Sequence, residues 1–271
     1  MGIVKLESVS FSYGNRRILE NINLDINKNQ LLCLFGANGC GKTTLLDCIT
    51  SMNVIESGKI FVKDKDLYDY SPRSLAKHIA YVPQKSQLTF PYKVMDVILM
   101  ARASRLSIYS RPSKKDYEKC LDALETIGVL HLQDKLFTEL SGGEAQLILI
   151  ARALAQETEL IIMDEPTAHL DYRYKYIVLN TIIELIKNKD VTIIMASHVP
   201  NHSYYLENNG IDVSVAILKD GKAYVNSILQ DALTEETILN VYSVDVKKIS
   251  FDHENYRKQN FIIPLGKRGC S

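Results

Sequence analysis

A glycine-rich segment that ends in a lysine and two threonines has the clearest chemical meaning in this sequence. It runs from Gly36 to Thr44 as Gly-Ala-Asn-Gly-Cys-Gly-Lys-Thr-Thr, between an apolar run and a helical pattern. Glycines let the backbone turn its N–H groups inward around an anion, and the N-terminus of the following helix adds a positive partial charge of about half a unit. The segment therefore predicts a P-loop that binds the phosphates of a nucleotide.

Two side chains of this loop are expected to act on the phosphates directly. Lys42 would bridge the β- and γ-phosphates, and the Thr43 hydroxyl would bind Mg²⁺. The alternative is a glycine turn that only joins a strand to a helix, and the bare pattern arises by chance in about one chain in a hundred. The flanking strand and helix favour the phosphate site. The predicted nucleotide-binding residues of the loop are Gly36, Asn38, Gly39, Cys40, Gly41, Lys42, Thr43 and Thr44.

A second acidic feature completes a phosphoryl-transfer site. The aliphatic run Leu160 to Met163 ends in Asp164 and Glu165. An aspartate at the carboxyl end of a buried strand can hold Mg²⁺ through its water, and the adjacent glutamate can orient or deprotonate an attacking water. Acidic residues commonly begin loops, so this feature is weak by itself. Together with the P-loop it predicts Asp164 as a Mg²⁺ ligand and Glu165 as the general base.

The segment Ser141-Gly142-Gly143-Glu144 opens a helical pattern that continues to Gln156. Ser141 followed three residues later by Glu144 matches a capping box, which any helix could use. A cap does not need two glycines, whereas a surface that exposes N–H groups and a helix dipole to a phosphate does. With these residues beside the P-loop and the Asp-Glu strand, the sequence resembles the ATP-binding-cassette (ABC) ATPases over nearly its whole length.

The resemblance implies roles for four further residues. Tyr13 matches the aromatic residue that stacks on adenine, although it could instead pack a turn. Gln84 matches the glutamine that senses Mg²⁺ and water, and His198 matches the histidine that contacts the γ-phosphate. Asp171 lies in a loop that signals across a dimer. The resemblance implies as catalytic residues Lys42, Gln84, Glu165 and His198, and as Mg²⁺ ligands Thr43, Gln84 and Asp164.

The resemblance also implies a head-to-tail homodimer joined by ATP. In this family Ser141, Gly142 and Gly143 of one subunit close over the γ-phosphate held by the P-loop of the other. Two departures are visible, because Glu144 replaces a more usual glutamine and Ala145 stands where a basic residue is common. ATP and Mg²⁺ are thus the expected cofactors, and hydrolysis would proceed by in-line attack of water.

The elements that must position these residues follow from hydrophobic periodicity. Continuous aliphatic runs predict buried parallel strands over residues 31–35, 160–163 and 191–195. Helical patterns cover residues 43–51, 114–127, 142–156 and 172–188. Short alternating strands are expected over residues 3–10, 22–26 and 59–63. The fold class expected is α/β: a P-loop ATPase core with a mostly parallel sheet, a small antiparallel β subdomain and a helical insertion.

The domain organisation expected from these patterns is one ABC ATPase domain over residues 1–243. Its core would comprise residues 1–85 and 157–243, and its helical subdomain about residues 86–156. In this subdomain Val94, Val97, Ile98 and Ala101 share one helix face. Ser113 with Asp116 resembles a capping box that opens another helix. A hairpin about Asp220-Gly221 and a helix over 235–242 would precede a polar tail at 244–271.

Composition excludes several classes of protein. The 32 basic residues cancel 32 acidic ones and no Lys/Arg block exceeds a pair, so nonspecific nucleic-acid binding is not expected. No apolar run reaches 18 residues and no targeting signal is visible, which predicts a cytosolic chain. Five cysteines without a CxxC pair predict reduced thiols, among which Cys40 beside the P-loop is expected to be oxidation-prone. His198 and His202 are spaced like a metal pair, but Pro200 between them argues against a metal site.

Similarity within the family narrows the expected function to transport. The Tyr-Val-Pro-Gln stretch ending at Gln84, the run Glu165 to Asp171 and the segment Val241 to Asp245 resemble importers of iron chelates, haem, vitamin B12 and molybdate. This implies a homodimer bound at the cytoplasmic face of the membrane to a permease dimer, which an extracellular or periplasmic binding protein supplies. The expected permease socket follows Gln84 and comprises Phe90, Pro91, Tyr92, Val94 and Met95, of which Val94 and Met95 could instead pack internally.

Two other functions remain open from the sequence. One is a soluble ABC ATPase in DNA repair, translation or iron–sulfur assembly, although no tandem cassette, coiled-coil insertion or basic surface is visible. The other is a P-loop kinase or GTPase, which would lack the Ser-Gly-Gly element and His198. Co-purification with a multi-spanning membrane protein would favour the importer.

Overall fold

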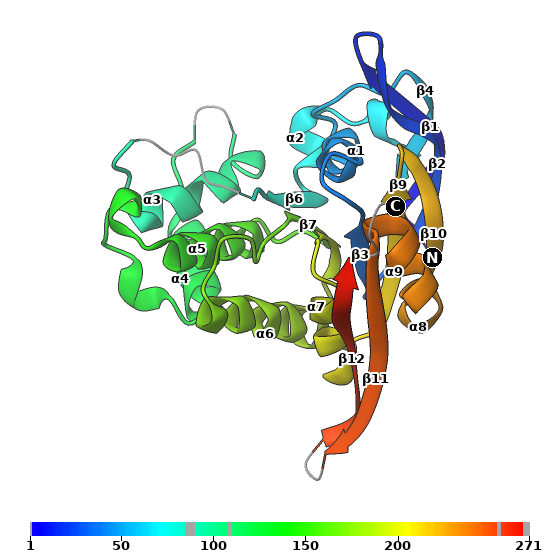
Figure 1. Ribbon diagram of the computed structural model, residues 1–271. Coiled ribbons are helices and arrows are strands. Elements are labelled where there is room, and N and C mark those ends of the chain that lie inside the picture. The colour runs from blue at the N-terminus through cyan, green and yellow to red at the C-terminus, as the bar shows by residue number, and fades with distance from the viewer. Residues whose placement is uncertain (1, 85–89, 108–109, 254–255, 268–271) are drawn as a thin grey trace. The chain divides into compact units, whose positions relative to one another are not determined.

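The computed structural model describes residues 2–84, 90–107, 110–253 and 256–267 (Figure 1). The chain divides into two compact units, the first made of residues 1–69 and 185–271 and the second of residues 70–184. Cys270 and the start of the expected helical subdomain at residues 86–89 lie outside the described residues. The expected domain at residues 1–243, with its subdomain boundaries, stays a prediction.

The first unit contains the parallel strands that carry the P-loop. Strand β3 (Leu31–Phe35) pairs in parallel with β8 (Thr192–Ala196) and β9 (Val213–Lys219), and β10 (Lys222–Ile228) is antiparallel to β9. All residues of β3 and β8 are buried, as continuous aliphatic strands require. Helix α1 (Lys42–Ile49) follows β3 through the P-loop. The strands predicted around residues 31–35 and 191–195 are therefore confirmed.

A separate antiparallel sheet in the first unit confirms the predicted β subdomain. Its order is β2-β1-β4-β5, and the elements are β1 (Gly2–Tyr13), β2 (Arg16–Asn27), β4 (Ser57–Val62) and β5 (Lys65–Asp66). Tyr13 pairs with Arg16 at the tight turn between β1 and β2. Strands β1 and β2 are longer than predicted, since β1 continues through Phe11 to Tyr13 and β2 begins at Arg16.

The segment after residue 243, expected as a polar tail, forms a two-stranded ribbon. Strands β11 (Val244–His253) and β12 (Tyr256–Lys267) pair antiparallel in the first unit (Figure 1). Val246 and Ile262 are buried on one face, and the amide side chain of Asn201 exchanges two hydrogen bonds with the backbone of Ile262. The other helices of this unit are η1 (Leu67–Asp69), α7 (Pro200–Asn208), α8 (Leu229–Ala232) and α9 (Glu235–Tyr242).

The second unit holds the strands β6 (Ile79–Val82) and β7 (Leu160–Asp164), which pair in parallel. Its helices are α2 (Pro72–Leu75), α3 (Val94–Leu99), η2 (Met100–Ser104), α4 (Lys114–Thr126), η3 (Leu130–Leu132), η4 (Phe137–Glu139), α5 (Gly142–Ala155) and most of α6 (Tyr172–Lys189). The predicted apolar face of Val94, Val97, Ile98 and Ala101 is buried, which confirms the helical insertion. Of the helices described, none combines the length and apolar character needed to cross a bilayer.

A buried ion network fixes the helices of the insertion. The Arg102 guanidinium donates to the Asp116 carboxylate at 3.0 Å, to the carbonyl of Ala155 at 2.7 Å and to the Glu157 carboxylate at 2.8 Å. Lys119 forms a second ion pair with Glu157. Asp116 also closes the capping box with Ser113 that was predicted for α4. Because Arg102 and Asp116 are 5% and 7% exposed, each buried charge depends on its partner.

Candidate functional site

The predicted site residues fall into two groups, one in each unit. The first unit contains Tyr13, the P-loop from Gly36 to Thr44, and His198. The second unit contains the other predicted residues, which are Gln84, Ser141, Gly142, Gly143, Asp164, Glu165 and Asp171. Each group is built from the ends of strands and the starts of helices, where backbone N–H groups and side chains are exposed to a ligand.

The lysine of the P-loop is hydrogen-bonded to carbonyl groups of the same loop. The Lys42 ammonium, on a side chain that is only 6% exposed, donates to the Gly36 carbonyl at 2.9 Å and to the Ala37 carbonyl at 3.4 Å. These carbonyls hold the positive charge within the turn of the loop, next to the N-terminus of α1. An anion that binds there would replace them as the partner of the ammonium.

Two glycines of the loop are required by its geometry. Gly36 has φ +148°, and an added Cβ would lie 2.4 Å from both the Leu218 carbonyl oxygen and the Cys40 sulfur. Gly41 has φ +106° at the N-cap of α1, where a Cβ would lie 2.9 Å from Leu19. An L side chain would be strained at both positions and would collide with neighbours. The loop's close packing against β2 and β9 therefore explains Gly36 and Gly41.

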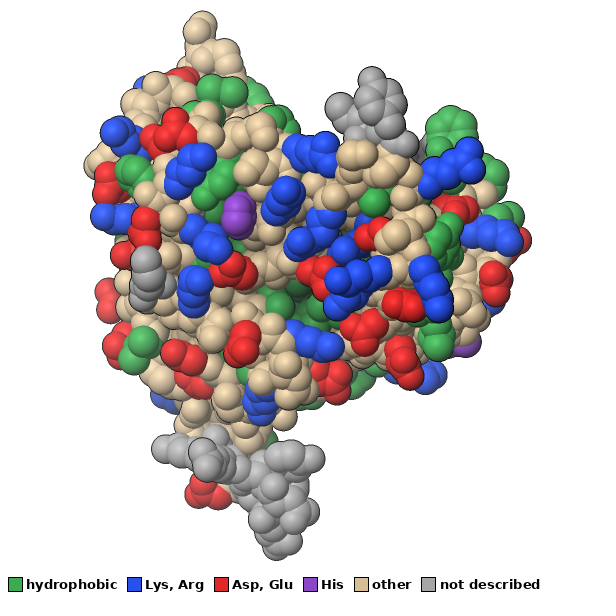
Figure 2. All heavy atoms as spheres, turned by 180° about the vertical axis from the view of Figure 1, so that it is seen from behind, with side chains coloured by type: hydrophobic (Ala, Val, Ile, Leu, Met, Phe, Trp, Pro, Cys, Tyr) green, Lys and Arg blue, Asp and Glu red, His purple; other side chains and the backbone are tan. Residues whose placement is uncertain are grey.

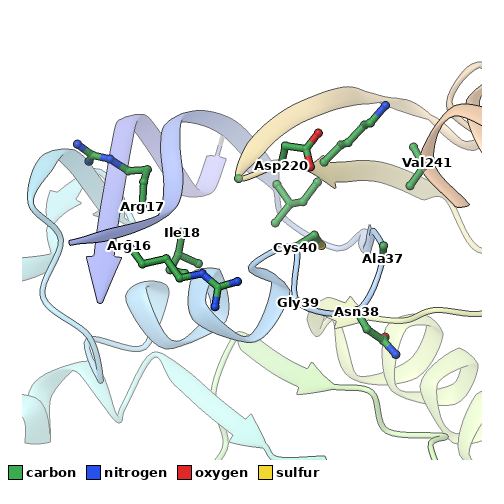
Figure 3. A pocket seen from close by; sticks show the side chains of 12 residues that line it. Arg16, Arg17, Ile18, Ala37, Asn38, Gly39, Cys40, Asp220 and Val241 are labelled. Carbon is green, nitrogen blue, oxygen red and sulfur yellow. The ribbon is translucent and has the colours of Figure 1, made fainter. Parts of the chain in front are cut away.

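A hollow of about 360 Å³ borders the P-loop within the first unit (Figure 3). It is lined by the start of β2, by loop residues 37–40, by the β9–β10 turn and by Val241 of α9. The sequence reasoning missed its basic residues Arg16, Arg17 and Lys219. The Arg-Arg pair directly after the Tyr13 turn was a usable signal, because a cationic pair near a phosphate loop suits a polyanion.

Tyr13 presents an open aromatic surface at the β1–β2 turn. Its side chain is 54% exposed, and its ring meets that of Phe11 edge to face with centroids 4.8 Å apart. The Tyr13 hydroxyl accepts a hydrogen bond from the Asn53 side chain at 3.0 Å. These contacts hold the ring while leaving much of its surface uncovered, so stacking on adenine stays a prediction for this residue.

Cys40 was expected to be oxidation-prone, but its burial opposes this by disfavouring the thiolate. Desolvation raises the pKa of the Cys40 thiol above its ordinary value, and the nearby positive charge of Lys42 opposes this effect only in part. Cys40 is thus mainly a neutral thiol at neutral pH and a weak nucleophile. The other described cysteines, Cys33, Cys48 and Cys120, are buried, and none of the four forms a disulfide.

In the second unit the structure brings two predicted catalytic side chains into contact. The Gln84 amide donates to the Glu165 carboxylate at 2.9 Å, although the residues lie 81 positions apart. Glu165 has φ +47°, which turns the chain sharply after β7. Asp164 ends β7 with a carboxylate that is 3% exposed. Hydroxyl, amide and carboxylate oxygens suit Mg²⁺, so the side chains of Thr43, Gln84 and Asp164 are of types that fit this ion. That these three side chains bind one Mg²⁺ ion together stays a prediction.

The capping box predicted at the start of α5 is confirmed. Glu144 accepts from the Ser141 backbone N–H at 2.8 Å and from the Ser141 hydroxyl at 2.7 Å, while its own N–H donates back to the Ser141 oxygen. These hydrogen bonds from Ser141 lower the pKa of the Glu144 carboxyl. The box thus satisfies two backbone N–H groups at the start of α5.

The two glycines of this helix start have different surroundings. A Cβ added at Gly143 would lie 2.3 to 2.6 Å from ring atoms of Tyr174, on α6. A Cβ added at Gly142 would meet nothing within 4 Å. Gly143 is therefore explained by packing, whereas Gly142 faces open space where a ligand could approach the N–H groups of α5.

A second hollow of about 320 Å³ lies in the second unit beside Gly142. Gln84, Gln146 and His169 supply its main polar side chains. Gln146, missed by the sequence reasoning, is 6% exposed, and its amide nitrogen makes no hydrogen bond within the described part of the chain. Asp171, predicted to signal across a dimer, accepts a hydrogen bond from the Tyr174 N–H at 2.9 Å and so also has a local role at the start of α6.

His198 and His202 do not lie on the same helix. Pro200 begins α7 between them, as the sequence predicted, so His198 precedes the helix that carries His202. Over residues 2–84, 90–107, 110–253 and 256–267, no group of three or more His, Cys, Asp or Glu side chains could hold a metal ion. Contact of His198 with a γ-phosphate stays a prediction.

Comparisons with known proteins agree with these features. The family profile described as ABC transporter matches residues 19–168. The molybdate import ATP-binding protein MolC of Haemophilus influenzae is 32% identical over 97% of each chain. The hemin import ATP-binding protein HmuV of Thermobifida fusca is 32% identical over 89% of this chain and 82% of its own. A structure described as an inward-facing conformation of a putative metal-chelate type ABC transporter shares 31% identity over 97% of each chain, with a TM-score of 0.84.

Proposed function

Because the chain belongs to the ABC transporter family as an ATP-hydrolysing subunit of the importer type, we propose that it powers uptake of a metal chelate or an oxyanion through a membrane permease. The solute classes are iron chelate, haem, cobalamin and oxyanion. The observation that carries the proposal is the P-loop, in which Gly36 and Gly41 adopt positive φ values that favour glycine and the Lys42 ammonium donates to the Gly36 carbonyl. Similarity to molybdate and hemin import proteins supports the direction of transport.

The proposed chemistry assigns a role to each catalytic side chain. Lys42 would bind the β- and γ-phosphates once its ammonium leaves the loop carbonyls. Mg²⁺, held by Thr43, Gln84 and Asp164, would supply positive charge for the transferring phosphoryl group. Glu165 would take a proton from the attacking water, with its carboxylate oriented by the Gln84 amide.

Dimerisation would complete the site. Helix α5 begins at Gly142, where an added Cβ would meet nothing within 4 Å. The N–H groups at this helix start could therefore receive a phosphate of a nucleotide bound by a second copy. In the proposed head-to-tail homodimer, Ser141, Gly142 and Gly143 of one subunit close on the nucleotide bound by the other. ATP binding would bring the two copies together and hydrolysis would release them.

The proposed permease socket keeps only part of its predicted lining. Phe90 is 66% exposed, Tyr92 is also exposed, and their rings lie 6.1 Å apart. Val94 is fully buried, so it packs internally, as the alternative interpretation expected. An exposed aromatic pair suits a short apolar helix of a partner protein. In this proposal the chain lies at the cytoplasmic face of the membrane, and a substrate-binding protein acts on the permease from outside.

Glu165→Gln tests the catalytic assignment. The variant should bind ATP, lose nearly all hydrolysis and accumulate as a dimer in size-exclusion chromatography with MgATP. Glu118→Gln, on the exposed face of α4, is the matched control and should behave as wild type. Unchanged hydrolysis in Glu165→Gln would refute the general-base role.

Purification from native membranes tests the transport assignment. A multi-spanning membrane protein should co-purify with the chain, and Phe90→Ser with Tyr92→Ser should weaken that association without changing ATP binding. Recovery with ribosomes or nucleic acid would instead favour a soluble ABC ATPase in translation or repair. The face seen in Figure 2 carries interspersed basic and acidic side chains, which is not the single-sign surface that nucleic acid favours.

A further inference from the structure

The C-terminal helix α9 reaches the P-loop through one hydrogen bond. The Gly36 backbone N–H donates to the Tyr242 hydroxyl at 3.1 Å, across 206 positions of sequence. Both residues belong to the first unit. Val241, the preceding residue of α9, is buried and lines the hollow beside the loop (Figure 3). The end of α9 is thus part of the surroundings of the phosphate loop.

The Gly36 peptide is held from both sides. Its N–H donates to Tyr242, and its carbonyl accepts from the Lys42 ammonium at 2.9 Å. Gly36 is buried in a backbone conformation that only glycine readily adopts, with the Leu218 carbonyl directly behind it. These contacts set the direction in which the loop leaves β3.

Helix α9, which carries Tyr242, is defined at both ends by hydrogen bonds. Helix α9 begins with the Thr234 side chain accepting from the Thr237 N–H. It ends where the Ser243 N–H donates to the Leu239 carbonyl and Ser243 adopts a left-handed conformation. The helix then packs on strand β11 of the C-terminal ribbon. The hydroxyl is therefore presented to Gly36 by a fixed helix end.

We propose that Tyr242 is a positioning residue for nucleotide binding, which its hydroxyl supports by holding the Gly36 peptide in the phosphate-binding arrangement. This inference rests on the proposed ATP-binding function. When the Lys42 ammonium moves to the phosphates, the Gly36 carbonyl loses that hydrogen bond. The hydrogen bond from the Gly36 N–H to the Tyr242 hydroxyl then remains to fix the orientation of the Gly36 peptide. The hydroxyl thus stabilises the nucleotide-bound loop more than the free loop.

Tyr242→Phe removes only the hydroxyl, and Tyr224→Phe is a matched control. The Tyr224 hydroxyl accepts from the Asn240 side chain at 3.3 Å, so the control removes a hydrogen bond of the same helix that does not touch the P-loop. Titration calorimetry with MgATP and MgADP measures affinity. Thermal unfolding without nucleotide measures stability, and steady-state ATPase assays give KM and kcat.

Tyr242→Phe should raise the Kd of both nucleotides about two- to tenfold, the range set by the net contribution of one hydrogen bond. KM for ATP should rise by a similar factor with a smaller change in kcat, and Tyr224→Phe should match wild type. Equal Kd values for Tyr242→Phe and wild type would overturn the inference. So would equal losses of affinity in both variants, because the effect would then come from α9 stability.

The design separates this inference from the proposed function. Wild-type protein that takes up no ATP in the calorimeter would refute the proposed function. Wild-type protein that binds ATP with the same affinity as Tyr242→Phe would refute only the role of Tyr242. Tyr242→His, which keeps a ring and offers a polar atom, gives a second test of the position if Tyr242→Phe lowers the yield of folded protein.

Discussion

The two glycines at the start of α5 should respond oppositely to alanine. Neither needs a positive φ, so an alanine fits the backbone at both positions. At Gly143 the new Cβ would lie 2.3 Å from the nearest Tyr174 ring atom, where an ordinary contact begins at 3.4 Å. The ring must therefore retreat by about 1 Å, whereas at Gly142 nothing needs to move.

The size of the effect on stability follows from this displacement. Overpacking costs about 1–3 kcal/mol, and the half-buried Tyr174 can relieve part of it by rotating, so we expect Gly143→Ala to lose about 1–2 kcal/mol. For a chain of this length that loss lowers Tm by about 2–8 °C. Gly142→Ala should leave Tm unchanged or raise it slightly, because alanine favours helix.

Activity should separate from stability in the same pair. Gly142→Ala should lower ATPase activity about tenfold or more if a phosphate of a second copy approaches this face, since its methyl group occupies the open space. Circular dichroism melts and a coupled ATPase assay measure both quantities. In a Tyr174→Ala background Gly143→Ala should cost little further stability, whereas Tyr174→Ala should not restore the activity of Gly142→Ala. A stable Gly143→Ala, or a destabilised Gly142→Ala, would refute the packing explanation for the two glycines.

Three further predictions concern a buried ion pair, the pH dependence of stability and thiol reactivity. Arg102→Met should cost about 3–5 kcal/mol in urea unfolding, because the buried Asp116 loses its cationic partner, and Arg102→Met with Asp116→Asn should recover part of the loss. Hydrogen bonds from Ser113, and then from Arg102, lower the pKa of the Asp116 carboxyl from 3.8 to about 2. The stability that the ionised carboxylate gives the fold is therefore complete above pH 4 and is lost as pH falls toward 2. Asp116→Asn should lack this pH dependence of stability. Alkylation of Cys40 should inhibit ATPase activity and should be slowed by MgATP. Mass spectrometry should show that alkylation is slow at pH 7 and accelerates above pH 9, and an alkylation rate independent of pH would contradict the raised pKa of the thiol.

Local patterns were sufficient where the interacting residues are close in sequence. The P-loop between an apolar strand and a helix, and the capping boxes at Ser113 and Ser141, involve neighbours only a few residues apart. Their chemistry is short-ranged, so composition and spacing determine it. The ribbon after residue 243 was missed because its apolar residues do not mark a buried face. In the part of the ribbon that the structure describes, Val246 and Ile262 are buried, whereas Phe251, Ile263 and Leu265 are exposed.

By itself the sequence determined the fold class and the family, and it predicted which residues would bind phosphate, because each is encoded in short motifs and hydrophobic periodicity. Only the tertiary structure decided that Gln84 contacts Glu165, that Tyr174 explains Gly143 and that Tyr242 holds Gly36. These contacts join positions far apart in the chain, and their geometry depends on how whole elements pack. No local pattern encodes such packing, since a tyrosine at the end of a helix looks the same whether it faces solvent or a phosphate loop.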